Sequence, residues 1–269
     1  MNAVILSIGD ELVLGQTVDT NGAWLSAQLA RRGIPTLFHK TIADDRAEIA
    51  RAIAEAVEKA DLVISTGGLG PTEDDLTRFA LADVMDAELV EHEPSVRHIA
   101  EFFRRRDRVM PVRNKVQAMC PAGAEMLENP AGTAPGIRAR LHDADCYFVP
   151  GVPREMRVLF EQHILPALPP ASGWTILSTT IHTFGKGESD VAELLGDLMD
   201  RGRNPKVGTT VARGIVSARI RSEFQTADEA RSALDETAGL VTERLGELVF
   251  GRDEQTLEQA VGRLLADRG

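Results

Sequence analysis

Apolar and polar positions in the first half of the chain alternate between strand-like and helix-like spacing. Short apolar runs at 4–8, 61–65 and 146–149 have the length of buried parallel strands, and 36–42 also reads as a strand. Apolar residues at helical spacing separate them, most clearly at 46–59. Strands that alternate with helices predict a mostly parallel sheet with helices on both faces, a three-layer α/β/α fold.

The pattern changes after a proline-rich stretch at 165–173, which we interpret as a linker. Beyond it, alternation at 174–184 and 215–224 predicts strands, and amphipathic spacing at 188–201 and 226–245 predicts helices. These elements together have the size of a second, smaller α+β domain.

The 269 residues are enough for two domains. We place the larger α/β domain at 1–170 and the smaller α+β domain at 171–252. The remaining residues, 253–269, contain a terminal amphipathic helix.

Composition narrows the classes of partner. A net charge of −11 argues against nucleic acid and against an anionic membrane surface. Cys120 and Cys146 form no Cys-x-x-Cys pair, and no apolar run approaches the roughly 20 residues that span a bilayer. The start of the chain also lacks a signal-peptide pattern. We therefore expect a soluble, cytoplasmic protein with reduced cysteines.

The segment 64–77 carries the strongest chemical signal. Its candidate ligand-binding residues are Thr66, Gly67, Gly68, Gly70, Pro71 and Thr72, and its candidate metal ligands are Asp74 and Asp75. Glycines let backbone N–H groups approach a phosphate, while carboxylates hold a metal. We expect Thr72 to cap a helix at 75–85 that carries the acids. Many glycine-rich turns bind nothing, and first-turn acids also stabilise a helix dipole without a metal.

Further candidates follow other strands of the predicted sheet. In such sheets ligands bind beyond the carboxyl ends of the strands, so these loops should share one rim. We expect Asp10 to bind a metal, Glu11 and Asp44 to act in catalysis, and Asp75 to act in both roles. Either Asp44 or Asp45 should instead cap the following helix. The loop residues Gly9, Pro150 and Gly151 are candidates for substrate binding.

Three candidate binding residues have alternative interpretations. Asn21 could hold a ribose hydroxyl or a base, or only begin its helix. Thr133 lies in a loop of turn residues, 129–136, that forms a pocket wall or an ordinary connection. Arg154 could bind phosphate or form a surface ion pair.

Several motifs together resemble the CinA family, named for competence/damage-inducible protein A. They are Ile8-Gly9-Asp10-Glu11-Leu12, 15–21, 66–77, 150–156, Asn114, Gln117-Ala118, 129–136 and 185–189. The resemblance covers nearly the whole chain. It implies a molybdopterin-binding domain of the MoaB and MogA type, followed by a KH-like domain. Full-length members continue into a nicotinamide mononucleotide deamidase domain, for which this sequence has no motif.

The resemblance also implies an activity, the metal-dependent hydrolysis of ADP-ribose to AMP and ribose 5-phosphate. By motif, the two aspartates that assist metal binding and chemistry in molybdopterin-handling relatives fall on Asp44 and Asp75. The expected cofactor is a divalent ion (Mg, Mn or Co), with K+ as a further candidate. We also expect a homo-oligomer, with a dimer as the first candidate.

Two other functions compete with hydrolysis. The first is a module that binds a molybdopterin-type pterin phosphate without hydrolysing anything. The second is RNA binding by the KH-like unit, which the acidic charge and the lack of a Gly-x-x-Gly loop in 174–250 argue against. A nucleotide or pterin is therefore the expected partner.

Overall fold

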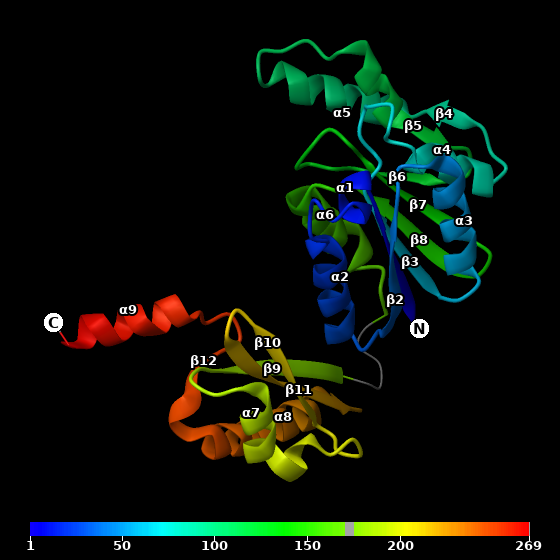
Figure 1. Ribbon diagram of the computed structural model, residues 1–269. Coiled ribbons are helices and arrows are strands. Elements are labelled where there is room, and N and C mark those ends of the chain that lie inside the picture. The colour runs from blue at the N-terminus through cyan, green and yellow to red at the C-terminus, as the bar shows by residue number, and fades with distance from the viewer. Residues whose placement is uncertain (170–174, 269) are drawn as a thin grey trace. The chain divides into compact units, whose positions relative to one another are not determined.

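The computed structural model describes residues 1–169 and 175–268 in two compact units, shown in Figure 1. The first contains Met1–Leu29 and Ile34–Pro169, and the second contains Ala30–Gly33 and the remainder of the chain. The predicted linker at 165–173 lies partly outside the described residues.

A six-stranded sheet forms the centre of the first unit. Its strands, in spatial order, are β2 (Thr36–Ile42), β1 (Ala3–Ile8), β3 (Leu62–Thr66), β8 (Ala144–Val149), β7 (Gly136–Leu141) and β6 (Glu125–Leu127). The pairs β1/β2, β1/β3 and β3/β8 are parallel, whereas β7 and β6 continue the sheet antiparallel. The predicted mostly parallel sheet is confirmed.

Helices cover both faces of this sheet. On one face lie α3 (Arg46–Val57) and α4 (Thr77–Val84), and on the other lie α2 (Thr20–Arg31) and α6 (Pro153–Leu159), the last continuing into a π-helical turn, η2 (Phe160–Ile164). The short helix α1 (Asp10–Val13) and the helix α5 (Glu93–Arg104) contribute no residue to either core. Alternate residues of β1 enter different cores: Leu6 lies in one core with Ile49 of α3, and Ile5 in the other with Leu25 of α2. The three-layer α/β/α fold follows from this alternation.

A smaller piece of structure lies between α4 and β6 along the chain. It contains the antiparallel pair β4 (Leu89–Glu91) and β5 (Met119–Pro121), with α5 and the 3-10 helix η1 (Val112–Ala118) between them. Cys120 of β5 is buried, and burial raises the pKa of its thiol to about 11. Both cysteines are free and buried, so they behave as core residues.

The second unit is an α+β domain. Its elements are β9 (Thr175–Thr183), α7 (Glu188–Leu195), η3 (Gly196–Met199), β10 (Lys206–Ala212), β11 (Ile215–Phe224), α8 (Ala227–Leu245), η4 (Gly246–Leu248) and β12 (Val249–Arg252). The sheet order is β10-β11-β9-β12, and all its pairs are antiparallel. The sequence did not predict β10, because most of this edge strand is exposed and lacks apolar alternation.

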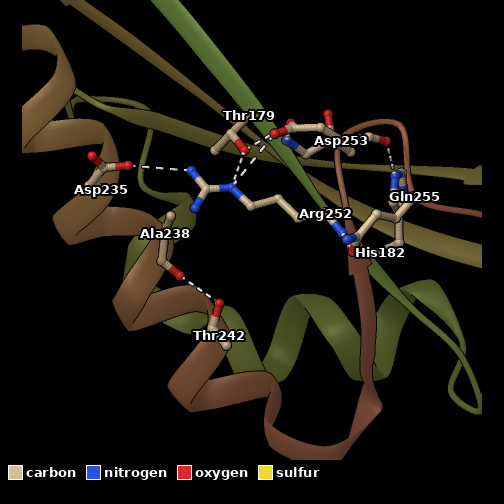
Figure 2. A network of polar contacts seen from close by, with 9 residues as sticks. Thr179, His182, Asp235, Ala238, Thr242, Arg252, Asp253 and Gln255 are labelled. Atoms are coloured by element: carbon tan, nitrogen blue, oxygen red, sulfur yellow. Dashed lines mark hydrogen bonds and ion pairs between the residues drawn. The ribbon is translucent and has the colours of Figure 1, made fainter. Parts of the chain in front are cut away.

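Hydrogen bonds tie the turn after β12 to the neighbouring strand β9, as Figure 2 shows. The carboxylate of Asp253 accepts from the Thr179 hydroxyl and the Thr180 backbone N–H, both at 2.9 Å. Arg252 Nε lies 2.7 Å from the same hydroxyl. Polar contacts thus help to hold the short edge strand β12 in place.

The terminal helix α9 (Leu257–Arg268) matches the amphipathic helix expected near the end of the chain. Its apolar residues Val261, Leu264 and Leu265 are exposed. Within residues 1–169 and 175–268, no helix combines the length and the apolar content needed to cross a membrane.

Candidate functional site

The ends of β1 and β3 meet where the chain changes direction across the sheet. From β1 the chain passes to β2 on one side and then to β3 on the other, which is the topological switch point where such sheets bind ligands. Gly67 follows β3 and donates its N–H to Val149 O at 3.0 Å. Its φ is +106°, and a Cβ atom there would overlap the carbonyl oxygen of Ile8. Only glycine allows the two strand ends to approach so closely.

The carboxylate of Asp75 accepts hydrogen bonds from the glycine loop that precedes it. One carboxylate oxygen accepts from Gly70 N at 2.6 Å, and the other accepts from Thr72 N at 2.8 Å and from the Thr72 hydroxyl. Two of the N–H groups expected to hold a phosphate therefore bind the protein's own carboxylate. The loop offers fewer free donors than its sequence suggested.

The prediction that Thr72 caps a helix carrying Asp74 and Asp75 is wrong. Helix α4 begins at Thr77, and both acids precede it in the turn. The reason is that Thr77 anchors the helix start on the glycines, its N–H donating to Gly68 O at 3.1 Å and its hydroxyl to Gly67 O at 2.9 Å. Thr72 meanwhile bonds to Asp75 and leaves the helix end uncapped.

Four carboxylates, those of Asp10, Glu11, Asp44 and Asp74, lie near one another beside the glycine loop. Asp10 and Asp44 bond reciprocally, each backbone N–H donating to the other's carboxylate at 2.9 and 3.0 Å. The pKa of Asp44 is raised, first by burial and then by the negative charges of Asp10, Glu11 and Asp74, although the Asp10 N–H opposes this. A carboxylate with a raised pKa beside like charges is typical of a functional site.

The pair Asp44-Asp45 divides its roles as the sequence predicts. Asp45 caps α3, accepting from Glu48 N at 2.9 Å, and its side chain is exposed. Asp44 makes no cap and faces Asp10 instead. Capping explains one of two adjacent acids, so the other is available for chemistry.

Asp44→Asn should raise the melting temperature at neutral pH. The pKa of Asp44 in the folded protein lies above its ordinary value of 3.8. Asp44 therefore stabilises the fold fully at pH values below 3.8, and this stabilisation is lost as the pH rises through the raised pKa. Removing the charge relieves that loss at neutral pH, and the gain should vanish in acid below 3.8. Thermal unfolding across pH measures both effects. Asp45→Asn is the control, since asparagine caps a helix equally well. A gain that persists in acid would contradict the explanation.

A pocket of about 130 Å³ opens beside these acids. Its lining includes Glu11, Asp19, Asn21, Thr66 and Gly151. Asn21 is only 8% exposed, and its amide nitrogen donates to Thr66 Oγ1 at 3.1 Å and to Gly151 O at 2.8 Å. Its Oδ1 is buried and has no hydrogen-bond partner among the described residues. A buried acceptor without a partner is costly unless a ligand O–H or N–H satisfies it.

Sequence reasoning missed Asp19 as a site residue. Its carboxylate accepts from the Ser7 hydroxyl at 2.6 Å and from Gly22 N at 2.8 Å. Asp19 thus caps the first turn of α2 and also forms part of the pocket wall. An aspartate three residues before Gly22 was a readable capping signal, but nothing local indicated that Ser7 would lie beside it.

Most of the predicted binding residues, Arg154 and Thr133 among them, do not line this pocket. Arg154 is exposed on the first turn of α6, and Thr133 lies in a loop that Asn129 holds closed, its amide donating to Ala134 O at 2.8 Å. The same amide donates to Glu155 at 2.7 Å, and burial raises the pKa of Glu155. Residues of this loop line hollows beside α5.

The carboxylates of the site do not by themselves complete the coordination shell of a divalent metal. Among the described residues, no group of three or more His, Cys, Asp or Glu side chains converges on one point. Asp10 and Asp44 nevertheless lie side by side next to the loop. Mg²⁺ commonly uses one or two carboxylates, with phosphate oxygens and water completing its shell. The residues therefore fit a metal that is shared with a phosphate ligand, and do not form an all-protein site.

Comparison with known proteins agrees with this fold. Residues 4–170 match the family described as "Probable molybdopterin binding domain", and residues 178–251 match "Damage-inducible protein CinA KH domain". The chain is 42% identical over 271 residues to a CinA-like protein of Deinococcus radiodurans, covering 99% of this chain and 66% of that one. It is 36% identical over 270 residues to a CinA-like protein of Dictyoglomus turgidum, covering 100% and 66%. The chain spans about two thirds of the length of these curated relatives.

A solved structure supports the same relationship. The protein CinA from Thermoplasma acidophilum, described as of unknown function, superposes with a TM-score of 0.57 at 32% identity. The match covers 62% of this chain and 98% of that one. With one domain of the molybdopterin-binding type followed by a KH domain of the CinA type, the chain belongs to the CinA family.

Proposed function

We propose that the protein is a divalent-metal-dependent nucleotide pyrophosphatase that hydrolyses ADP-ribose to AMP and ribose 5-phosphate. The observation that supports the proposal is the reciprocal contact of Asp44 with Asp10 beside the glycine loop, where burial and the charges of Asp10, Glu11 and Asp74 raise the pKa of Asp44. A general base works best when its pKa is shifted toward the working pH. The choice of ADP-ribose rests on the family resemblance.

Each residue has a distinct part in the proposed reaction. Water attacks one phosphorus, the bridging P–O bond breaks, and the water proton passes to the Asp44 carboxylate. Asp10 and Asp44 would hold a divalent metal, which when bound would supply charge neutralisation and acidify water. Asp75 holds the loop in shape through Gly70 N and Thr72 N. Asn21 Oδ1 accepts a hydrogen bond from a hydroxyl group of the ligand.

Incubating the purified protein with ADP-ribose tests the proposal. We expect AMP and ribose 5-phosphate in equal amounts with Mg, Mn or Co, and none after chelation, because the carboxylates of Asp10 and Asp44 repel an anionic phosphate unless a cation lies between them. Chromatography of both products measures turnover, and a K+ series tests the further ion. NAD and FAD serve as comparison substrates. No turnover with any metal would overturn the proposal.

A second candidate function is binding of a molybdopterin-type pterin phosphate without hydrolysis. The match of residues 4–170 to "Probable molybdopterin binding domain" favours it. Mass spectrometry of ligand that co-purifies from a host that makes the cofactor distinguishes the two. A bound pterin, with no turnover of ADP-ribose, would support this function and exclude the first.

A further inference from the structure

A second and larger hollow borders the glycine loop. It has a volume of about 420 Å³ and shares no lining residue with the 130 Å³ pocket. We call it the α4 pocket; its lining is Arg46, Pro71, Thr72, Glu73, Leu76, Phe79, Arg113 and Val116. The wall Pro71–Glu73 belongs to the same loop that Asp75 holds in shape.

The floor of the α4 pocket is apolar and partly exposed. Leu76 and Phe79 come from the turn before α4 and from α4, and Val116 comes from η1. The Arg46 guanidinium lies 5.7 Å from the centre of the Phe79 ring while pairing with Asp83 at 2.6 Å. A flat aromatic group packs well on such a floor, because ring–ring contact adds to apolar burial.

The α4 pocket has a positively charged side chain, that of Arg113, in its lining. The side chain of Arg113 is exposed and has no hydrogen bond or ion pair with any residue in the described part of the chain. The guanidinium of Arg46, by contrast, donates two hydrogen bonds to the Asp83 carboxylate. In a chain of net charge −11, a free arginine beside apolar surface suits an anionic ligand, and its planar fork matches phosphate.

The α4 pocket also adjoins the acids of the candidate site. Glu73 directly precedes Asp74, whose charge raises the pKa of Asp44. The smaller pocket reaches the same acids through Glu11. Each hollow is thus lined by a residue that belongs to this group of carboxylates or is next to it in sequence, Glu11 in the smaller and Glu73 in the larger.

We propose that the α4 pocket binds the base-bearing half of the substrate, a purine nucleoside monophosphate. The purine lies on Leu76, Phe79 and Val116, and its phosphate pairs with Arg113. The sugar at the other end of the pyrophosphate then takes the smaller pocket at Asn21. This inference rests on the proposed function for its substrate, but the binding that it describes needs no turnover.

Calorimetric titration with AMP, adenosine and ribose 5-phosphate tests the assignment on the full chain. Arg113→Gln should weaken the binding of AMP roughly tenfold or more and leave the affinity for adenosine unchanged, because the substitution removes only a charge-assisted contact to the phosphate. Phe79→Leu keeps an apolar side chain but removes the ring, and it should weaken the binding of AMP and of adenosine alike, by roughly fivefold. Lys115→Gln, on an exposed lysine of η1 outside the pocket, is the matched control and should change neither.

The outcomes separate this inference from the proposed function. AMP affinity that is unchanged in both Arg113→Gln and Phe79→Leu, with both variants folded by thermal melting, would overturn it. Arg113→Gln weakening ribose 5-phosphate in place of AMP would overturn it too, since the pocket would then hold the other half. If the wild-type protein binds AMP as described but never hydrolyses ADP-ribose, the pocket assignment stands and the proposed hydrolysis fails.

Discussion

Replacing Asp44 with asparagine is expected to lower ADP-ribose hydrolysis roughly a hundredfold or more, the usual loss when a positioned general base is removed. Asparagine is isosteric and still accepts the Asp10 N–H that Asp44 accepts at 2.9 Å, so the loop should keep its shape. The variant lacks a carboxylate that can take a proton or bind a metal. Initial rates over a metal series measure the loss.

The neighbouring residue provides the control for this experiment. Asp45→Asn changes the same chemical group one position along the chain, at the helix cap, and should keep wild-type activity. Equal rates for wild type and Asp44→Asn would show that Asp44 is not the base. Asp75→Ala is also expected to abolish activity, but it releases Gly70 N and Thr72 N as well, so it reports on loop shape and chemistry together.

Gly67→Ala is expected to destabilise the first unit by about 3 kcal/mol or more. At φ +106° a side chain is strained, and the new Cβ would overlap Ile8 O, a backbone atom that cannot move without disturbing β1. Urea denaturation followed by hydrogen exchange of β1 and β3 measures the loss in this unit.

Gly15→Ala separates the two causes of that destabilisation. Gly15 has a φ of +69°, but nothing lies within 4 Å of its added Cβ. We expect only the cost of the left-handed conformation, about 1–2 kcal/mol. If both variants lost the same stability, the close approach of the strand ends would not be the reason for glycine at 67.

Much of the fold could be predicted because it is recorded in local periodicity. The run 4–8 indicated a buried strand, and β1 places alternate residues in two cores. The helix α3 begins one residue after Asp45, as its capping pattern predicts. By contrast, the edge strand β10 was missed, since an exposed strand has no apolar alternation to detect.

The candidate site was predictable only in part. The rule for parallel sheets placed the loops after β1, β2 and β3 on one rim, and the reciprocal bonds between Asp10 and Asp44 agree. The helix expected to carry Asp75 begins later, because Thr77 has partners on Gly67 and Gly68 that a helical pattern cannot reveal. The position of Thr133 depended on the path of a loop, which periodicity does not encode, and Arg154 is exposed on the first turn of α6.

The sequence by itself determined the alternation of strands and helices in the first half of the chain, the glycines at strand ends, and that one of Asp44 and Asp45 caps α3, because each depends on residues a few positions apart. Only the tertiary structure decided that Asp75 occupies the loop's own N–H groups, that Asn21 Oδ1 is buried with no partner among the described residues, and that Arg113 and Phe79 line one pocket. The physical reason is that burial, charge and hydrogen-bond supply at these atoms come from segments distant in the chain.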